Sequence, residues 1–299
     1  MNNKNIKGNV ILMITALIWG SAFVAQSVGM EHVGPFTFIT ARYIIGGIFL
    51  IPCMILLNKI NKSNVKKYEK SDRKNLIVGG ILCGIALFVA SSFQQIGIEY
   101  TTVGKSGFIT ALYIIIVPIL GMFFKKKVQG RVWISVVIAL IGLYLLCINE
   151  SFKISNGDLL ILMCAFCFSI HILIIDKYSP IVDGVKMSCI QFFVAGILGV
   201  IPMYIFENPN IYNLLQAYSP ILYAGVMSSG VAYTLQIIGQ KYTSPVMATL
   251  IMSLESVFAA LSGWIILGEV FSIKEFCGCV LVFVAIIFAQ LPKKSVSNN

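Results

Sequence analysis

The sequence is poor in charged residues, in histidine and in long polar segments. Asp, Glu, Lys and Arg make up only 11% of its 299 residues, whereas a soluble domain carries about 25%. Hydrophobic residues make up 58%, so a soluble fold of this length would have too little polar surface to cover itself. The composition therefore predicts an all-α integral membrane protein and excludes an ordinary soluble domain.

Motifs for ATP-driven or metal-dependent chemistry are missing as well. No G-x-x-x-x-G-K-[ST] string is present, and the polar segments are too short for an ATPase domain. The two histidines, His32 and His171, are far apart, and the acidic residues are scattered. A metal site or a membrane enzyme needs clusters of such residues. We therefore expect no bound metal, no cofactor and no enzymatic activity.

Cysteines and basic residues are present, but in places that argue against their usual roles. All eight cysteines lie inside apolar runs, where no disulfide could staple a loop. Cys164 and Cys167 have redox spacing, but they lie in mid-span and are expected to be packing residues. The net charge of +10 comes from basic residues in short runs between apolar spans, so no nucleic-acid binding is expected.

Long apolar runs dominate what the sequence does contain. Ten runs of about 17–25 residues predict ten membrane-spanning helices. They cover residues 9–28, 35–57, 75–97, 103–124, 131–148, 157–175, 185–206, 218–238, 245–267 and 273–291. The first run is longer than the core of a signal peptide and many spans follow it, so we expect a retained helix.

Lys and Arg are distributed unevenly over the segments between these runs. Eighteen of the 22 basic residues fall in the two terminal tails and in the even-numbered loops. Because positively charged loops stay in the cytoplasm, this bias predicts that both termini are cytoplasmic. The helical spans and the absence of an organelle signal predict a multi-pass protein of the cell (cytoplasmic) membrane.

The two halves of the chain resemble each other. Residues 100–127 match residues 242–269 at an offset of 142 positions, and Tyr113 falls opposite Glu255. Other equivalent pairs are Gly8 and Gly157, Pro52 and Pro202, Gln94 and Gln236, Gly97 and Gly239, and Tyr100 and Tyr242. We therefore divide the chain into a first repeat at 1–149, a second at 150–292 and a cytoplasmic tail at 293–299. Because each repeat has an odd number of spans, five, the second repeat must cross the membrane in the opposite direction to the first. Such inverted repeats are common in secondary transporters, whose binding sites lie near mid-membrane.

Three groups of residues combine in a characteristic order and spacing. The first runs from Ile18-Trp19-Gly20-Ser21 through Gly34-Pro35-Phe36 to Arg42, the second from Ser92-Phe93-Gln94-Gln95 through Gly107-Phe108 to Pro118, and the third from Ser253-Leu254-Glu255 to Leu267-Gly268-Glu269. With them the chain resembles the EamA family of the drug/metabolite transporter superfamily over nearly its whole length. The resemblance implies a membrane transporter of small metabolites, often an exporter. The family often places proline directly after the glutamate of the ninth span, where this chain has Ser256.

Glu255 is the first candidate for a functional site. It lies about 11 residues into its span, on the order of 16 Å from the membrane boundary at 1.5 Å per residue. A charge at this depth is costly and usually faces protein or a water-filled cavity. It is either a substrate or proton site, or a structural carboxylate. Arg42 lies at a similar depth, so the two side chains could pair; the alternative for Arg42 is an arginine that snorkels to the interface.

Six further side chains are candidates for lining the same cavity. They are Trp19, Gln94, Gln95, Tyr113, Gln236 and His171. The glutamines could bind a polar substrate or form hydrogen bonds between helices. Trp19 and Tyr113 could line the cavity or pack in the core, and His171 is either a satisfied core residue or a group that handles protons.

We expect a secondary transporter that exports small metabolites by alternating access between two inverted repeats. Amino acids or related compounds are the expected substrates, with drugs as a further class. The expected partners are a small-molecule substrate, the lipid bilayer and protons, while a monomer and a homodimer both fit the sequence. The alternatives are a membrane enzyme and a structural or receptor protein, which would need a partner surface.

Overall fold

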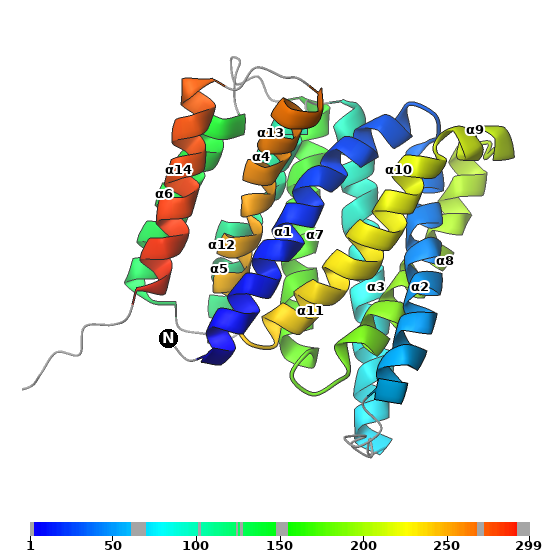
Figure 1. The fold of residues 1–299 in the computed structure, drawn as a ribbon, viewed down its shortest axis with the longest axis horizontal. Coiled ribbons are helices and arrows are strands. Elements are labelled where there is room, and N and C mark those ends of the chain that lie inside the picture. The colour runs from blue at the N-terminus through cyan, green and yellow to red at the C-terminus, as the bar shows by residue number, and fades with distance from the viewer. Residues whose placement is uncertain are drawn as a thin grey trace, which may run out of the picture.

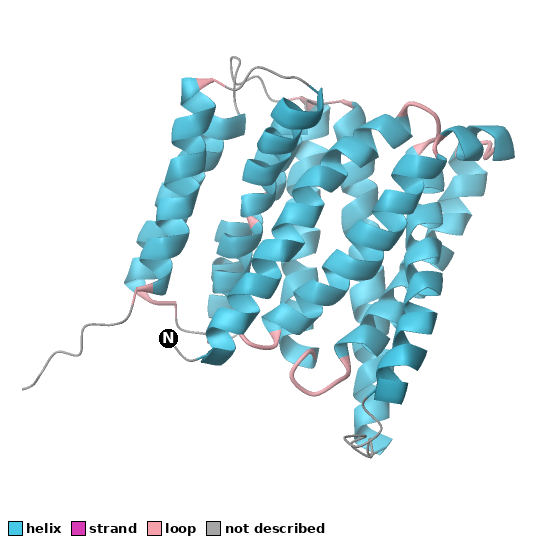
Figure 2. Ribbon diagram, in the orientation of Figure 1, coloured by secondary structure: helices cyan, strands magenta, loops and turns pink. Residues whose placement is uncertain are grey.

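The computed structural model describes residues 3–60, 70–100, 103–123, 125, 128–147, 155–267 and 272–291. All secondary structure in these ranges is helical, and the connecting turns gather at the two ends of the bundle (Figure 2). The first helix begins and the last helix ends at the same end, which is the lower one in Figure 1.

The helices follow the predicted runs closely. In chain order they are α1 (Asn3–Met30), α2 (Pro35–Ile60), α3 (Lys70–Glu99), α4 (Val103–Thr110), α5 (Tyr113–Phe123), α6 (Gly130–Cys147), α7 (Asn156–Tyr178), α8 (Gly184–Phe206), α9 (Ile211–Gln216), α10 (Tyr218–Leu222), η2 (Tyr223–Tyr233), α11 (Thr234–Gln240), α12 (Pro245–Met252), α13 (Leu254–Leu267) and α14 (Ile273–Gln290). Only α9, on the connection after α8, has no counterpart among the predicted runs.

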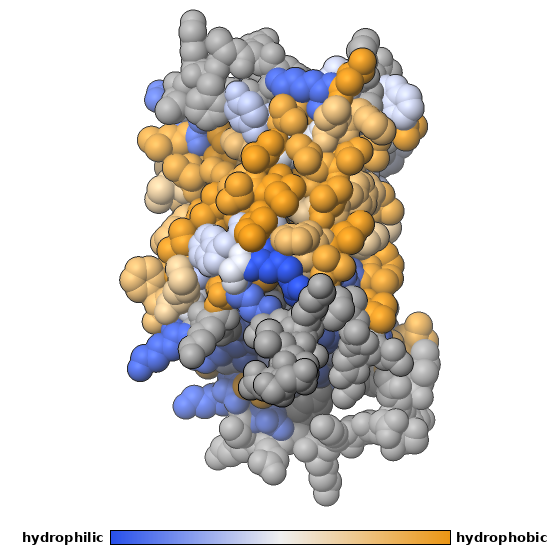
Figure 3. All heavy atoms as spheres, turned by 90° about the vertical axis from the view of Figure 1, so that its left-hand side faces the viewer, coloured by the Kyte–Doolittle hydropathy of each residue, from blue (hydrophilic) through white to orange (hydrophobic). Residues whose placement is uncertain are grey.

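Within the described residues, nine helical segments are long and apolar enough to cross a membrane, and 130–146 forms a shorter apolar helix. Large apolar side chains remain exposed along them, among them Ile48, Ile141, Ile197 and Ile287. On the one face that Figure 3 shows, hydrophobic side chains form a belt across the middle, with hydrophilic side chains toward the ends. Such an exposed belt suits lipid. The chain is a multi-pass membrane protein.

Two of the predicted spans are interrupted in the middle. The fourth is divided between α4 and α5 at positions 111–112, and the ninth between α12 and α13 at Ser253. At the second break Thr249 and Ser253 donate their hydroxyls to the carbonyls of Val246 and Leu250, both at 2.8 Å. Such local bonds compete with the helical ladder and bend helices. The ninth span is therefore interrupted without a proline.

The eighth span contains a π-helical stretch, η2, between α10 and α11. A wide turn of this kind is rare and often lies at functional sites. Gly225, Ser229 and Gly230 give η2 a narrow face, and a side chain at Gly46 of α2 would lie 2.9 Å from the Ser229 Cβ. The small residues thus let α2 pack directly on η2.

Helices from the two halves pack on each other throughout the bundle. Helix α6 packs on α14 along one edge, α2 on α8 near the opposite edge, and α3 on α7 (Figure 1). A side chain at Gly142 or Gly278 would meet the other helix's backbone at 2.8 or 2.6 Å. The α6–α14 contact therefore depends on glycine at both positions.

Equivalent glycines make equivalent contacts in the two halves. A Cβ on Gly8 would lie 2.9 Å from the Tyr242 Cβ, and one on Gly157 would lie 2.9 Å from the Tyr100 Cβ. Gly8 and Gly157, like Tyr100 and Tyr242, are the pairs that the sequence aligns. The first contact joins α1 to the end of α11, and the second joins α7 to the end of α3.

The start of α2 is held by the carboxylate of Glu207, the residue that directly follows α8. Glu207 accepts hydrogen bonds from the backbone N–H groups of Phe36 and Thr37 at 2.7 and 2.8 Å, and from the Thr37 hydroxyl at 2.6 Å. A negative group satisfies the free N–H groups of a helix N-terminus and complements its dipole. This contact fixes the first turn of α2, the helix that carries Arg42.

Candidate functional site

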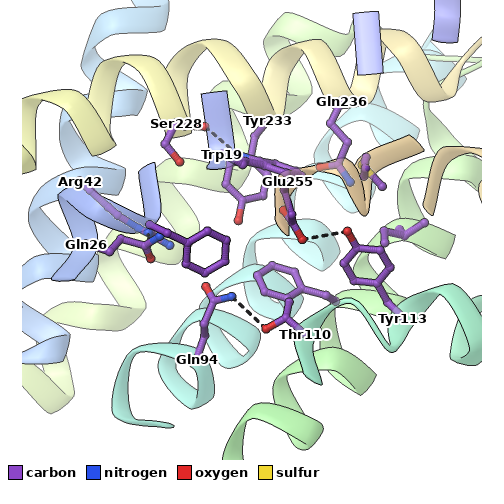
Figure 4. A pocket seen from close by; sticks show the side chains of 14 residues that line it. Trp19, Gln26, Arg42, Gln94, Thr110, Tyr113, Ser228, Tyr233, Gln236 and Glu255 are labelled. Carbon is purple, nitrogen blue, oxygen red and sulfur yellow. Dashed lines mark hydrogen bonds between the residues drawn. The ribbon is translucent and has the colours of Figure 1, made fainter. Parts of the chain in front are cut away.

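A pocket lies in the interior of the bundle, between the two halves of the chain. Its walls are formed by Trp19, Phe23 and Gln26 of α1, Arg42 of α2, Gln94 of α3, Thr110 of α4, Tyr113 of α5, Phe168 and Ile172 of α7, Ser228 and Tyr233 of η2, Gln236 of α11, Met252 of α12 and Glu255 of α13. The two halves contribute equally to this wall (Figure 4).

Glu255 and Tyr113 meet directly in this pocket. The Tyr113 hydroxyl donates a hydrogen bond of 2.8 Å to Oε1 of Glu255. Each residue follows the break in its span, in the first turn of α5 or α13. They are 142 positions apart, the offset that relates the two halves. Only 5% of Glu255 is exposed.

Arg42 occupies another side of the pocket, and all its hydrogen-bond partners are neutral. It donates to Oε1 of Gln26 at 3.0 Å, to the Tyr43 hydroxyl at 2.6 Å and to the Ser91 hydroxyl at 3.2 Å. The guanidinium also lies over the Tyr43 ring, 4.6 Å from its centroid. Its Nε has no partner, and the residue is only 2% exposed. Among the described residues, no carboxylate forms an ion pair with Arg42.

The remaining wall combines aromatic rings with amides. Trp19 donates through Nε1 to the Ser228 carbonyl of η2 at 3.3 Å, and its ring centroid lies 4.7 Å from that of Tyr233. Gln94 donates to the Thr110 hydroxyl at 3.4 Å, whereas the buried Oε1 of Gln236 has no partner. The rings supply an apolar wall, and the amides offer further hydrogen-bonding groups.

Six of the eight candidates from the sequence thus line one pocket: Glu255, Arg42, Trp19, Gln94, Tyr113 and Gln236. Gln95 and His171 are fully buried outside the pocket lining. Nε2 of His171 lies 3.1 Å from Oε1 of Gln191, and its ring contacts that of Tyr233 edge-on at 6.0 Å. His171 therefore supports a ring of the wall from behind.

Sequence reasoning missed eight lining residues: Phe23, Gln26, Thr110, Phe168, Ile172, Ser228, Tyr233 and Met252. The repeat contained a signal for several of them. Gly8 aligns with Gly157, an offset of 149, and the same offset carries Trp19 onto Phe168 and Phe23 onto Ile172. The offset of 142 carries Thr110 onto Met252. Ser228 gave no such signal, because the π-helical turn that presents it cannot be read from the sequence.

A second hollow opens at the end of the bundle where α1 begins and α14 ends. Its volume is about 750 Å³, and its wall includes Asn5, Asn9, Arg131, Lys241 and Ser244. The central pocket is far smaller, about 40 Å³. A single water needs roughly 10–15 Å³ and a ligand pocket typically has about 300–1,000 Å³. The central pocket has room for a few waters, so a metabolite would fit only after the helices around it move apart.

Comparison with known proteins bears directly on this architecture. The model of the EamA-like transporter family matches residues 6–148 and 155–290. The chain belongs to this family. Membership makes the protein a membrane transporter and is consistent with the expectation that it is not an enzyme.

Three relatives named as transporters match more than nine-tenths of this chain. An uncharacterized transporter of Archaeoglobus fulgidus is 30% identical over 96% of this chain and 87% of its own. The uncharacterized transporter YoaV of Bacillus subtilis is 23% identical over 91% and 92% of the two chains. For the uncharacterized inner membrane transporter YedA of Escherichia coli K12 the identity is 22% over 93% and 88%.

A protein of known crystal structure shares the fold. Its chain superimposes with a TM-score of 0.77 over 95% of this chain and 96% of its own, at 16% sequence identity. At such low identity the likeness concerns the fold alone. The arrangement of helices described above is therefore one already seen in a crystal.

Proposed function

We propose that this EamA-like protein is a secondary transporter that exports small metabolites across the cytoplasmic membrane by alternating access. The observation that carries the proposal is the composition of the central pocket, whose wall contains residue pairs from equivalent positions of the two halves. These pairs are Trp19 and Phe168, Phe23 and Ile172, Gln94 and Gln236, Thr110 and Met252, and Tyr113 and Glu255. A site that two repeats share lies where their relative motion exposes it to either side.

Ten spans in two inverted repeats account for these pairs. The repeated contacts of Gly8 and Gly157 join equivalent helices, one at the start of α1 and the other at the start of α7. The breaks in the fourth and ninth spans also fall at equivalent positions, since Ala111 aligns with Ser253. The proposed repeats then run over 1–149 and 150–292, and the proposed cytoplasmic tail at 293–299 lies outside the described residues.

The proposed direction of transport is outward, and the proposed orientation supports it. The basic loops place both termini in the cytoplasm, and the hollow of about 750 Å³ opens at that end. A substrate would enter from the cytoplasm through this hollow, reach the central pocket once the lower ends of the helices separate, and leave on the opposite side.

Glu255 supplies the proposed coupling to protons. Among the described residues it is the only carboxylate in the pocket lining, and a buried carboxylate that is alternately protonated and ionised can link substrate release to proton uptake. Tyr113 orients this carboxylate by its hydrogen bond. The pocket would then exchange a substrate for a proton at one carboxylate.

Reconstitution in liposomes tests the function. We expect a labelled metabolite from a panel of small polar compounds to accumulate by counterflow in vesicles that contain the protein and not in empty vesicles. An imposed proton gradient should further drive the same compound uphill. The compound should accumulate on the more acidic side, because the proposed carrier exchanges it for protons. Uptake whose rate does not change with the proton gradient at any pH tested would contradict the proton coupling. The proposal that the protein is a carrier would still stand.

A further inference from the structure

The hollow at the end of the bundle where α1 begins is lined by polar and basic side chains. Its wall includes Asn9 of α1, Arg131 of α6, and Lys241 and Ser244 between α11 and α12. We propose that this hollow binds a phosphate ester that carries hydroxyl groups, the chemistry of a phosphoglycerol group. The inference goes beyond the proposed function, because a phosphate ester can bind here whether or not the hollow also admits a substrate.

The charged residues of the wall that the structure describes are both basic. They are Arg131 and Lys241, and no described residue of the wall is acidic. A third cation lies close by, since Nζ of Lys7 is 5.7 Å from the ring centroid of Tyr242, another residue of the wall. Arginine and lysine are the side chains with which proteins bind phosphate. An anion that enters the hollow would therefore meet cations on several helices.

Several helices have their termini at this hollow. Helices α1, α6 and α12 begin there, while α11 and α14 end there. The N–H groups at a helix start favour anions, phosphate among them, whereas the carbonyl groups at a helix end favour cations. The two effects largely offset each other, so the basic side chains decide the sign of the ligand, and the helix starts supply further hydrogen-bond donors.

Asn9 indicates what the ligand carries besides the phosphate. This wall residue is only 8% exposed, and its buried Oδ1 has no hydrogen-bond partner among the described residues. A buried acceptor without a partner is costly. A hydroxyl group of the ligand could donate to this oxygen, whereas a phosphate diester without hydroxyl groups could not.

The hollow lies next to a surface that suits lipid. Ile134 follows Arg131 by three positions on α6, and Ile287 precedes Gln290 by three positions on α14, so each shares a helix face with a residue of the wall. Both isoleucines are exposed. On the side of the bundle that carries these helices, hydrophobic side chains give way to hydrophilic ones toward this end (Figure 3).

This position favours a lipid as the source of the phosphate ester. Acyl chains that lie on the two isoleucines would bring a headgroup to the hollow, and basic pockets between transmembrane helices bind anionic headgroups. The volume of about 750 Å³ falls within the range of about 300–1,000 Å³ that is usual for ligand sites.

Retention of defined lipids by the purified full-length protein tests the proposal. The delipidated protein is mixed in detergent with lipids of the same acyl chains, and bound lipid is measured by native mass spectrometry. Phosphatidylglycerol has a negative charge and hydroxyl groups, phosphatidylethanol keeps the charge but lacks the hydroxyl groups, and phosphatidylcholine has neither. We expect phosphatidylglycerol to be retained about tenfold or more over phosphatidylcholine, and about threefold or more over phosphatidylethanol.

Variants of the wall should change retention in different ways. Lys241→Gln and Arg131→Gln should each weaken the retention of both anionic lipids about fivefold, and Asn9→Leu should make the two anionic lipids equal. Arg131→Lys keeps the charge and should keep the preference over phosphatidylcholine even if Arg131→Gln does not fold. Lys177→Gln is the matched control, because it removes an exposed cation at the same end of the bundle but outside the wall. We expect it to retain lipids as wild type does.

A soluble phosphate ester, glycerol 3-phosphate, distinguishes the two sources of the ligand. If an excess of it leaves phosphatidylglycerol bound, the ligand is a lipid headgroup. If it displaces the lipid and by itself raises the melting temperature of the delipidated protein, the ligand is a soluble phosphate ester and the proposed chemistry stands.

Two outcomes would overturn the site. They are equal retention of phosphatidylglycerol and phosphatidylcholine by wild type, and a loss of retention in Lys177→Gln as large as that in Lys241→Gln, which would mean general attraction to a basic surface. Equal retention of phosphatidylglycerol and phosphatidylethanol by wild type would overturn the recognition of hydroxyl groups by Asn9.

Discussion

Replacing Glu255 by glutamine is expected to reduce transport by about ten- to a hundredfold and to abolish its dependence on a proton gradient. The amide has nearly the same shape, and its oxygen can still accept the hydrogen bond from Tyr113. What it loses is the charge and the proton, and a hydrogen bond to a charged group contributes about 1.5–3 kcal/mol. The fold should persist, because a neutral side chain is less costly than a carboxylate in mid-membrane.

The measurement compares initial rates of counterflow at several imposed proton gradients for wild type and variant at equal protein content. Tyr113→Phe separates orientation from charge: it removes the donor but leaves the carboxylate, so we expect slower transport that still responds to the gradient. A Glu255→Gln protein that transports at the wild-type rate and retains the gradient response would show that the carboxylate is structural.

Replacing Gly20 by leucine is expected to have the largest effect on the folded state. A Cβ at this position would lie 2.5 Å from the Cβ of Phe258 and 2.8 Å from both the Ala259 nitrogen and the Glu255 carbonyl oxygen. Backbone atoms cannot yield as a flexible side chain does, so α1 would have to move away from α13. Overpacking commonly costs about 1–3 kcal/mol, and a leucine against backbone should reach or exceed the upper value.

The loss of stability is measured by thermal unfolding in detergent, with size-exclusion chromatography used to monitor the folded fraction. Gly130→Leu is the matched control, because a Cβ at Gly130 has no neighbour within 4 Å. We expect the free energy of unfolding of the control to lie within about 0.5 kcal/mol of that of wild type. The stability of Gly20→Ala should fall between that of the control and that of Gly20→Leu. Equal stability of the Gly20→Leu and Gly130→Leu proteins would mean that α1 and α13 are not packed as described.

The spans could be predicted from hydropathy because a membrane imposes length and apolarity on each helix. Among the described residues, nine of the ten predicted runs coincide with helical segments long and apolar enough to cross a membrane, and the fifth coincides with a shorter apolar helix. The fourth run is divided between α4 and α5, and the ninth between α12 and α13. The division of the ninth span could not be predicted because it depends on local hydroxyl bonds of Thr249 and Ser253, which hydropathy does not reveal. The π-helical turn of the eighth span is likewise set by packing between helices.

The candidate site could be predicted in part. Glu255, Arg42, Trp19 and Tyr113 stood out because a polar or bulky side chain deep in a span is unusual, and all four line the pocket. The same rule also selected Gln95 and His171, which lie outside the lining. Depth can be counted along a helix, but the face on which a side chain lies depends on neighbouring helices that the sequence does not locate.

A direct pairing of Arg42 with Glu255 was a sequence-based hypothesis, and it stays one for other states of the protein. In the present structure the two residues share the pocket but bond to different partners. Because they come from different halves of the chain, the proposed motion of the repeats would change the distance between them. A pocket of about 40 Å³ fits a state in which the helices have closed around it.

Access to the pocket from the two sides of the membrane tests the central claim most directly, and it requires no known substrate. In a variant whose eight cysteines are replaced, Ser228→Cys places a thiol in the pocket wall, where the residue is only 3% exposed. Asn208→Cys and Pro180→Cys, both at exposed positions in turns at opposite ends of the bundle, report the two membrane faces.

A small membrane-impermeant thiol reagent is then applied to one face of the membrane at a time. We predict that Asn208→Cys reacts only from outside and Pro180→Cys only from inside, while Ser228→Cys reacts from either face, and more slowly than both. A Ser228→Cys protein that reacts from one face alone, or from neither, while the two reporters behave as predicted would contradict alternating access to this pocket.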